Sequence, residues 1–143
     1  MCNVFIDTNV LVYSLDAEDL EKQRQARDLL KKLSMHYAPV ISTQVLKEFY
    51  VVAVKKMKVA PGAAKEMVGN FRNMRIVNND IDLIVQAIDI SILYKVSFWD
   101  SLILAAAEQA GCKYLLSEGL NSGQVYRGVL VVNPFQEDIT FHR

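Results

Sequence analysis

The sequence predicts an α/β fold in which a parallel sheet is covered by helices on both faces. Short apolar runs bounded by polar turn formers, typical of buried strands, alternate with longer segments whose apolar residues recur at helical spacing. This alternation indicates strand–helix–strand units, which build parallel sheets. The first apolar run ends in Asp7, followed by Thr8 and Asn9. Because open α/β sheets bind ligands at the carboxyl ends of their strands, Asp7 is the first candidate residue for a functional site.

Composition is consistent with one globular domain over residues 1–143. The hydrophobic fraction of 52% is enough for a full core, and we find no linker, repeat or low-complexity stretch among the 143 residues. Lys+Arg and Asp+Glu both number 16, so the net charge is zero. The chain therefore lacks the basic excess of many nucleic-acid binders, and any such role rests on a local patch or on metal ions.

Cysteine content and hydropathy indicate a reducing compartment. Cys2 and Cys112 form neither a disulfide framework nor a pair at metal-ligand spacing, so each is expected to pack as a small apolar residue. No basic leader with an apolar core precedes the first strand, and no apolar run approaches the roughly 20 residues that span a membrane. We expect a cytoplasmic protein with no membrane association.

In the first half of the chain, each element follows from spacing and caps. The segment after the first strand is apolar and short, and the next shows leucines at helical spacing opposite charged residues. Thr43 is expected to cap the helix that Pro61 and Gly62 interrupt. The expected elements are a strand at 3–6, helices at 10–14 and 16–35, a strand at 39–42, and helices at 43–57 and to residue 74.

The second half repeats the pattern. Asn79 or Asp80 can cap a strongly apolar helix, and Gly111 ends an alanine-rich helix that Asp100 begins. A polar, glycine-rich turn is expected at 118–124, and no structure is assigned to the tail at 135–143. The expected elements are a strand at 75–77, a helix at 81–94, the alanine-rich helix, and strands at 113–117 and 128–132.

Four acidic residues occupy comparable positions in these units. Asp7 and Glu118 lie at or just past strand ends, Glu48 lies early in the helix after the second strand, and Asp100 begins the alanine-rich helix. Strand ends and the starts of the following helices share one edge of a parallel sheet, so the four are expected to converge. Carboxylates held together repel one another, and a divalent cation with hard oxygen ligands, Mg²⁺ or Mn²⁺, removes that cost.

Each carboxylate also has a purely structural interpretation. Asp7 and Asp100 can serve only as helix caps. Glu48 on an otherwise apolar helix is harder to explain in this way, because an inward-facing unpaired carboxylate is costly. The interpretation as a shared acidic site therefore depends on the four residues meeting in space.

The chain resembles the PIN-domain ribonucleases, in particular VapC-like toxins of bacterial and archaeal toxin–antitoxin pairs. The resemblance covers most of the chain in the expected order and spacing. The segments that carry it are VFIDTNVLVY at 4–13, STQVLKEF at 42–49, FWDSLI at 98–103, LLSEGLNSGQ at 115–124, and the Val132-Asn133-Pro134-Phe135 stretch.

The resemblance implies a three-layer α/β/α sandwich with a central parallel sheet and metal-dependent hydrolysis of RNA. Asp7, Glu48 and Asp100 match the family's acidic metal-site positions, and Thr8 matches the hydroxyl that supports the site. One or two Mg²⁺ or Mn²⁺ ions would activate water against the scissile phosphate and leave a 3′-hydroxyl and a 5′-phosphate. Single-stranded RNA or a loop of a structured RNA such as tRNA is the expected substrate.

The fourth acidic position departs from the family pattern. Relatives of this subgroup commonly have Ser-Glu-Asp after the fourth strand, where this chain has Ser117-Glu118-Gly119. Either Glu118 is the remaining fourth acidic residue, as a catalytic and metal-binding group, or the site has three strong carboxylates with Asn121 lending an amide oxygen. Fewer charges predict weaker binding of a second cation.

The resemblance also implies partners. Such toxins are silenced by a small antitoxin whose tail enters the acidic groove, often with an Arg or Lys that reaches the carboxylates. The apolar early helices are expected to hold the antitoxin or a second copy of the chain, so a homodimer is expected.

Other classes of function give alternative interpretations of the sequence. A PIN-fold module that has lost catalysis through Gly119 would bind RNA or a partner protein without cutting. A phosphatase that uses the aspartate at the end of the first strand requires a second Asp two residues later, where this chain has Asn9. A receiver domain requires an acidic pair and a strand-end Lys, and neither is evident here. A dinucleotide-binding fold requires a glycine-rich turn after the first strand, and no such turn follows it in this chain.

The remaining candidate residues carry weaker signals. Trp99 is expected to pack in the core, with base stacking as the alternative. His36 and His142 show no partner spacing that would support a histidine-based triad. Three lysines are expected to be solvated, with contact to RNA phosphates beyond Glu48 as the alternative: Lys55, Lys56 and Lys58.

Overall fold

The computed structural model describes residues 1–137 and contains a six-stranded sheet in the order β3-β2-β1-β4-β6-β5. Five strands run parallel, which confirms the expected parallel sheet, and the short edge strand β5 runs antiparallel to β6. The strands are β1 (Asn3–Ile6), β2 (Ala38–Ser42), β3 (Arg75–Val77), β4 (Tyr114–Leu116), β5 (Val125–Tyr126) and β6 (Val129–Val132).

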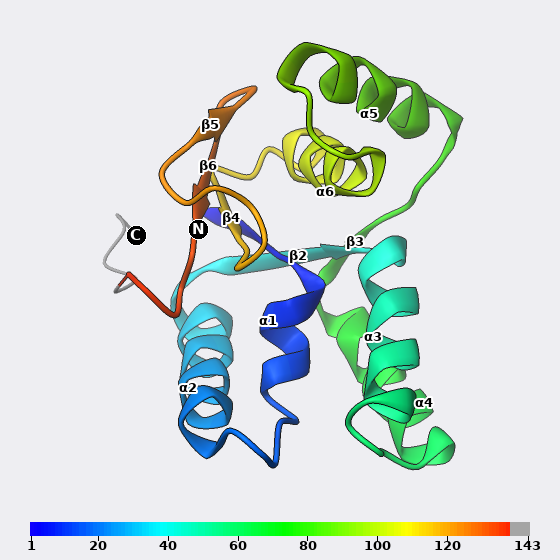
Figure 1. Cartoon of the computed structure of the whole chain (residues 1–143), viewed down its shortest axis with the longest axis vertical. Helices are drawn as coiled ribbons and strands as arrows, with labels where there is room; N and C mark the ends of the chain where they lie inside the picture. The colour runs from blue at the N-terminus through cyan, green and yellow to red at the C-terminus, as the bar shows by residue number, and fades with distance from the viewer. Residues whose placement is uncertain (138–143) are drawn as a thin grey trace.

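Helices cover both faces of the sheet, as expected of a three-layer α/β/α sandwich. Figure 1 shows α1, α2, α3 and α4 on one side of the sheet and α5 and α6 on the other. The helices are α1 (Thr8–Tyr13), α2 (Leu20–His36), α3 (Thr43–Lys55), α4 (Pro61–Asn70), the 3₁₀ turn η1 (Phe71–Asn73), α5 (Ile81–Tyr94) and α6 (Phe98–Gln109). No helix among residues 1–137 is long and apolar enough to cross a membrane.

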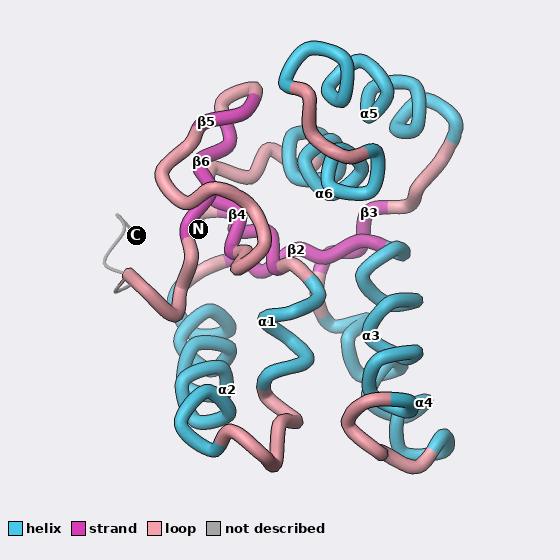
Figure 2. Tube along the Cα trace, in the orientation of Figure 1, coloured by secondary structure: helices cyan, strands magenta, loops and turns pink. Residues whose placement is uncertain are grey.

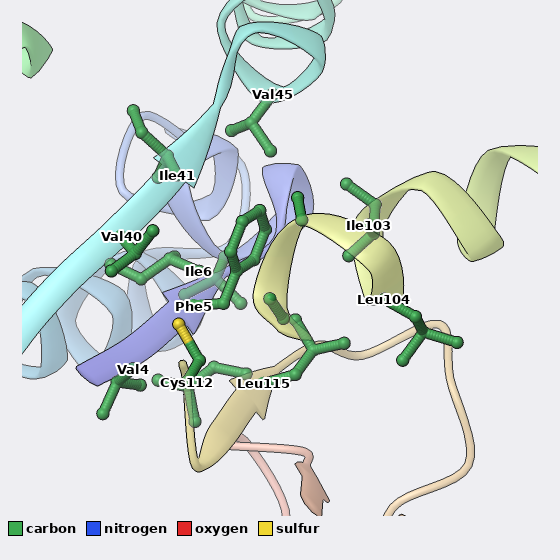
Figure 3. Close-up of a cluster of buried hydrophobic side chains, with 14 of the residues drawn as sticks. Val4, Phe5, Ile6, Val40, Ile41, Val45, Ile103, Leu104, Cys112 and Leu115 are labelled. Carbon is green, nitrogen blue, oxygen red and sulfur yellow. The ribbon is translucent and has the colours of Figure 1, made fainter. Parts of the chain in front are cut away.

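The pairing of the central strand β1 with its two neighbours determines which residues lie together at the carboxyl edge of the sheet. Phe5 pairs with Val40 of β2 and Leu115 of β4, and all three side chains are fully buried. Figure 3 shows Phe5 and Leu115 in one apolar cluster with Ile103 of α6. The register continues past the strands, because the N–H of Asp7 donates to the Leu116 carbonyl at 3.0 Å. The residues that follow β1 and β4 therefore lie side by side.

Three helix starts differ from expectation or refine it. Ser42, not Thr43, caps α3, because the extended Ser42 precedes the helix and its hydroxyl accepts from the N–H of Val45 at 3.4 Å. Thr43 is the first helical residue. Asp80 caps α5, as one of the two expectations had it. Ser97 caps α6 by accepting from the N–H of Asp100 at 3.1 Å, so the interpretation of Asp100 as a cap is wrong.

Two element boundaries depend on turns that the pattern did not reveal. The helix expected from residue 16 begins at Leu20, because Asp19 caps it and the Asp16 carboxylate holds a preceding turn. The antiparallel pair of β5 and β6 was not expected; it closes through Arg127 and Gly128, whose φ angles of +47° and +81° match a tight hairpin turn.

Other expectations concern cysteines and the tail. Cys2 and Cys112 are both free, as expected, and burial raises the pKa of the Cys112 thiol to about 12. Residues 138–143 of the tail, and His142 with them, lie outside the described residues.

Candidate active site

Asp7 stands at the carboxyl end of β1, where the chain turns into α1. One carboxylate oxygen accepts from the N–H of Thr8 at 2.7 Å, and the other accepts from the hydroxyl of Ser117 at 2.8 Å. Asp7 is therefore the N-cap of α1, as its structural interpretation holds. The cap uses only one of its two oxygens, so capping does not account for the Ser117 contact.

The electrostatic setting of Asp7 is unusual for a cap. Burial raises the pKa of Asp7 to about 6, although the hydrogen bonds from Ser117 and Thr8 act in the opposite direction. The negative charges of Glu48 and Asp100 raise this pKa further. Three carboxylates from three different elements are thus close enough to repel one another, which a bound cation would relieve.

Glu48 reaches the same place from α3. Its carboxylate accepts a hydrogen bond from the hydroxyl of the buried Thr8 at 2.7 Å. Glu48 is exposed, so the premise that it faces inward without a partner is wrong. It borders a cleft of about 610 Å³, lined by Asp7, Thr8, Asn9, Val12, Tyr13, Lys47, Glu48, Val51, Val52, Lys56 and Met57.

Asp100 approaches from the opposite layer of the sandwich. It lies in the first turn of α6, and the start of α6 is tied to the start of α3 by the Gln44 side-chain amide, which donates to the Trp99 carbonyl at 3.3 Å. This link explains how helices on opposite faces of the sheet bring their acidic residues to one edge.

Glu118 makes other contacts. One of its carboxylate oxygens is ion-paired to Lys22, and the other accepts from the Tyr13 hydroxyl at 2.5 Å. Partial burial raises the pKa of Glu118, but the bonds from Lys22 and Tyr13 outweigh burial and hold that pKa below its usual value. Glu118 therefore contacts Lys22 and Tyr13, whereas Asp7 contacts Thr8 and Ser117.

The donors that remain fit a hard divalent cation by their chemistry. Residues 1–137 hold no ready-made group of three or more His, Cys, Asp or Glu side chains for a metal. Asn9, however, lines the cleft, and its buried Oδ1 has no hydrogen-bond partner. Carboxylate and amide oxygens are the ligands that Mg²⁺ and Mn²⁺ prefer, and their mutual repulsion here favours a cation.

Gly119 leaves space beside Asn9. A Cβ atom at residue 119 would lie 3.9 Å from the Asn9 amide nitrogen, which is ordinary contact. The N–H of Gly119 donates to the Ser117 hydroxyl at 3.2 Å, and that hydroxyl donates to Asp7. Two hydrogen bonds thus connect the backbone N–H of Gly119 to Asp7, although glycine has no side chain that could supply a ligand oxygen.

Several contacts escaped sequence reasoning. The side chain of Trp99 is 65% exposed, so the expectation that it packs in the core is wrong. Of the three lysines considered, Lys56 lines the cleft, together with Lys47. Asn121 is exposed. Ser117, Asn9, Tyr13 and Lys22 were not singled out as side chains of the site, although all but Lys22 lie in the segments that match the family.

The fold places the chain in the class of α/β proteins that have a mostly parallel sheet, here with acidic residues at its carboxyl edge, and comparison with known proteins identifies the family. The PIN domain family model matches residues 4–126, so the chain belongs to the PIN-domain family. A comparison with curated proteins finds no match.

Solved structures of toxin–antitoxin proteins share the fold. VapBC from Salmonella typhimurium, solved bound to DNA, is 18% identical with a TM-score of 0.66 and covers 92% of this chain and 97% of that one. FitAB bound to an IR36 DNA fragment is 17% identical, with a TM-score of 0.71 and coverage of 96% and 99%. Mycobacterium tuberculosis VapC20, a Sarcin-Ricin loop cleaving toxin, is 19% identical, with a TM-score of 0.60 and coverage of 78% and 86%.

Proposed function

We propose that this chain is a metal-dependent endoribonuclease and the toxin of a toxin–antitoxin pair. The observation that carries the proposal is that three carboxylates from separate elements gather at one sheet edge: Asp7, Glu48 and Asp100. Membership of the PIN-domain family supports it. The shared fold with a protein described as a Sarcin-Ricin loop cleaving toxin supports it further.

The proposed site assigns a task to each residue. Asp7, Glu48 and Asp100 would hold Mg²⁺ or Mn²⁺, with the unpartnered oxygen of Asn9 available as a neutral donor. When bound, the cation would stabilise charge on the phosphoryl oxygens and lower the pKa of water. The Thr8 hydroxyl orients Glu48, and the Ser117 hydroxyl orients Asp7. Lys47 and Lys56 at the cleft wall would attract phosphates.

The proposed substrate is single-stranded RNA or the loop of a structured RNA. Trp99 exposes 65% of its surface beside Asp100, so its indole is available to stack on an unpaired base. An exposed base can be read in this way, whereas a base inside a duplex cannot.

RNA cleavage in defined metal conditions tests the proposal. The metal-free protein should cut single-stranded RNA when Mn²⁺ or Mg²⁺ is added and should stop when EDTA is added, because the charges of the three carboxylates need a cation before they can approach a phosphate. Gel analysis of end-labelled RNA would measure the cuts. A module that only binds RNA would shift its mobility with no cation-dependent products, and that result would favour the non-catalytic alternative.

Two exposed apolar surfaces support the proposed partners. A groove between α3 and α4 is lined by Leu46, Lys47, Tyr50, Val51, Lys65 and Val68, and we assign it to the antitoxin. The similar structures include a toxin–antitoxin complex from Klebsiella pneumoniae, 21% identical with a TM-score of 0.66. The outer face of α5 exposes Ile81, Val85, Ile88 and Ile92 at helical spacing, and we assign it to a second copy of this chain.

Substitution on α5 tests the dimer. Ile88→Lys places a charge in the centre of the α5 face and should halve the mass measured by light scattering, since a buried unpaired ammonium is costly. Asp89→Lys, on the same helix and also exposed, is the matched control and should leave the mass unchanged. A wild-type chain that stays monomeric at all concentrations would contradict the assignment.

A further inference from the structure

Glu118 belongs to a cluster beside the acidic cleft that is made of Tyr13, Lys22, Glu118 and Phe135, and Tyr13 also lines the cleft. Lys22 is ion-paired to Glu118 and lies 4.1 Å from the ring centroid of Tyr13 and 5.1 Å from that of Phe135. The two rings meet edge to face, with centroids 5.2 Å apart. We call these four residues the Glu118 clamp.

The clamp joins four separate segments at the site, with Phe135 in the stretch that follows β6. Tyr13 ends α1, Lys22 lies in α2, and Glu118 lies in the loop that follows β4 (Figure 2). Figure 1 shows α1 and α2 next to each other under the sheet. The loop is consequently attached to α1 at both ends of that helix, through Ser117 and Asp7 at its start and through Glu118 and Tyr13 at its end.

We propose that Glu118 is a positioning residue that acts through Lys22 to hold Ser117 against Asp7, and that it is not a ligand of the cation. This inference rests on the proposed function in that it concerns the same site. Both carboxylate oxygens of Glu118 are already engaged, one by Tyr13 and one by Lys22. A cation bound at Glu118 would also lie beside the Lys22 ammonium, whose positive charge repels it.

The surroundings of Lys22 strengthen its ion pair with Glu118. Its side chain is 24% exposed and that of Glu118 is 31% exposed, so the pair is only partly screened by water. Isolated surface ion pairs contribute little, but here the ammonium also faces two aromatic rings. The immediate neighbours of Glu118 are Ser117, which donates to Asp7, and Gly119, which donates to Ser117. Holding Glu118 therefore holds the hydrogen bonds that orient Asp7.

Exchanging the charges of Glu118 and Lys22 distinguishes a positioning role of Glu118 from a role as a cation ligand. Glu118→Lys and Lys22→Glu should each weaken Mn²⁺ binding about fivefold in calorimetry, because like charges then repel within the clamp. The double variant should recover to within about twofold of wild type, since the opposite charges are restored. A lysine at residue 118 cannot ligate a cation, so this recovery supports positioning. A double variant that binds as weakly as Glu118→Lys would overturn the proposal.

A conservative variant and a matched control complete the design. Glu118→Gln keeps the shape of the side chain and one acceptor oxygen for Lys22, and its new NH2 group can donate to the Tyr13 oxygen. It should bind Mn²⁺ within about twofold of wild type, whereas loss of a ligand should cost about tenfold or more. This variant decides the question even if the charge-reversed single variants fail to fold. Exchange of Arg24 and Asp28, an exposed ion pair on the same helix, should leave Mn²⁺ binding unchanged.

Hydrogen exchange gives a readout that does not depend on the cation. The Gly119 amide donates to Ser117, so its exchange should accelerate in each single charge variant and slow again in the double variant. If the wild-type chain binds no Mn²⁺ and cuts no RNA, the proposed function fails, and the exchange of Gly119 still decides whether Glu118 positions this loop. Unchanged exchange in all variants would overturn the positioning role.

Discussion

Asp7→Asn is expected to abolish RNA cleavage, with a loss of at least about a thousandfold, while the protein stays folded. Asparagine has nearly the same size and keeps an oxygen that can accept from the Thr8 N–H or the Ser117 hydroxyl. It removes the negative charge that repels those of Glu48 and Asp100 and that a cation needs. The rate is measured on single-stranded RNA with EDTA-treated, re-metallated protein.

The same substitution should stabilise the metal-free protein. The pKa of Asp7 is raised from 3.8 to about 6, so the folded state carries a cost for the ionised carboxylate at neutral pH. A shift of this size corresponds to at most about 3 kcal/mol in the free energy of unfolding. Asp89→Asn, at an exposed position on α5, is the control and should change neither quantity. An Asp7→Asn protein that cuts RNA at the wild-type rate would refute the mechanism.

The second large effect is the dependence of cation binding on pH. A cation needs the ionised form of Asp7, and protons compete for that form below the pKa of about 6. The Mn²⁺ association constant should be level above about pH 6 and should fall roughly tenfold for each pH unit below it. Calorimetric titrations between about pH 5 and 8 measure this, with RNA cleavage expected to follow the same curve at limiting Mn²⁺.

The stability of the metal-free protein should change in the opposite direction. The folded state binds the Asp7 proton more tightly than the unfolded state does, because the folded pKa is the higher one. The contribution of Asp7 to the free energy of unfolding therefore increases as pH falls from about 6 toward 3.8 and levels off below that value. Denaturant titrations of wild type and Asp7→Asn isolate it by difference. A wild-type binding curve whose break lies near pH 4 would contradict the raised pKa.

Local pattern was sufficient for much of the architecture. The apolar run of β1 ends at Asp7 because successive buried residues need a strand and a charged residue must leave the core. Helix α5 spans Ile81–Tyr94, the same residues that its apolar spacing and its cap Asp80 predicted. Parallel topology followed from the alternation of strands and helices. These features depend on neighbours in sequence, which a single chain displays directly.

Local sequence pattern predicted only part of the arrangement of the carboxylates. The positions of Asp7, Glu48 and Asp100 at strand ends and helix starts predicted their approach, and their mutual effect on the pKa of Asp7 agrees with it. Glu118 has the same kind of position in the chain, yet its carboxylate meets Lys22, which is 96 residues away in sequence. Spacing could not reveal this contact, because it depends on how α2 packs against α1.

The sequence by itself thus determined the α/β architecture, the family and the edge of the sheet at which Asp7, Glu48 and Asp100 gather. Tertiary structure alone decided which side chains satisfy one another there: Thr8 with Glu48, Ser117 with Asp7, and Lys22 with Glu118. It also decided that Asn9 keeps an unpartnered oxygen and that Trp99 lies exposed. The physical reason is that periodicity specifies which face of an element is buried, whereas a side-chain contact also requires the distance and direction that packing between elements supplies.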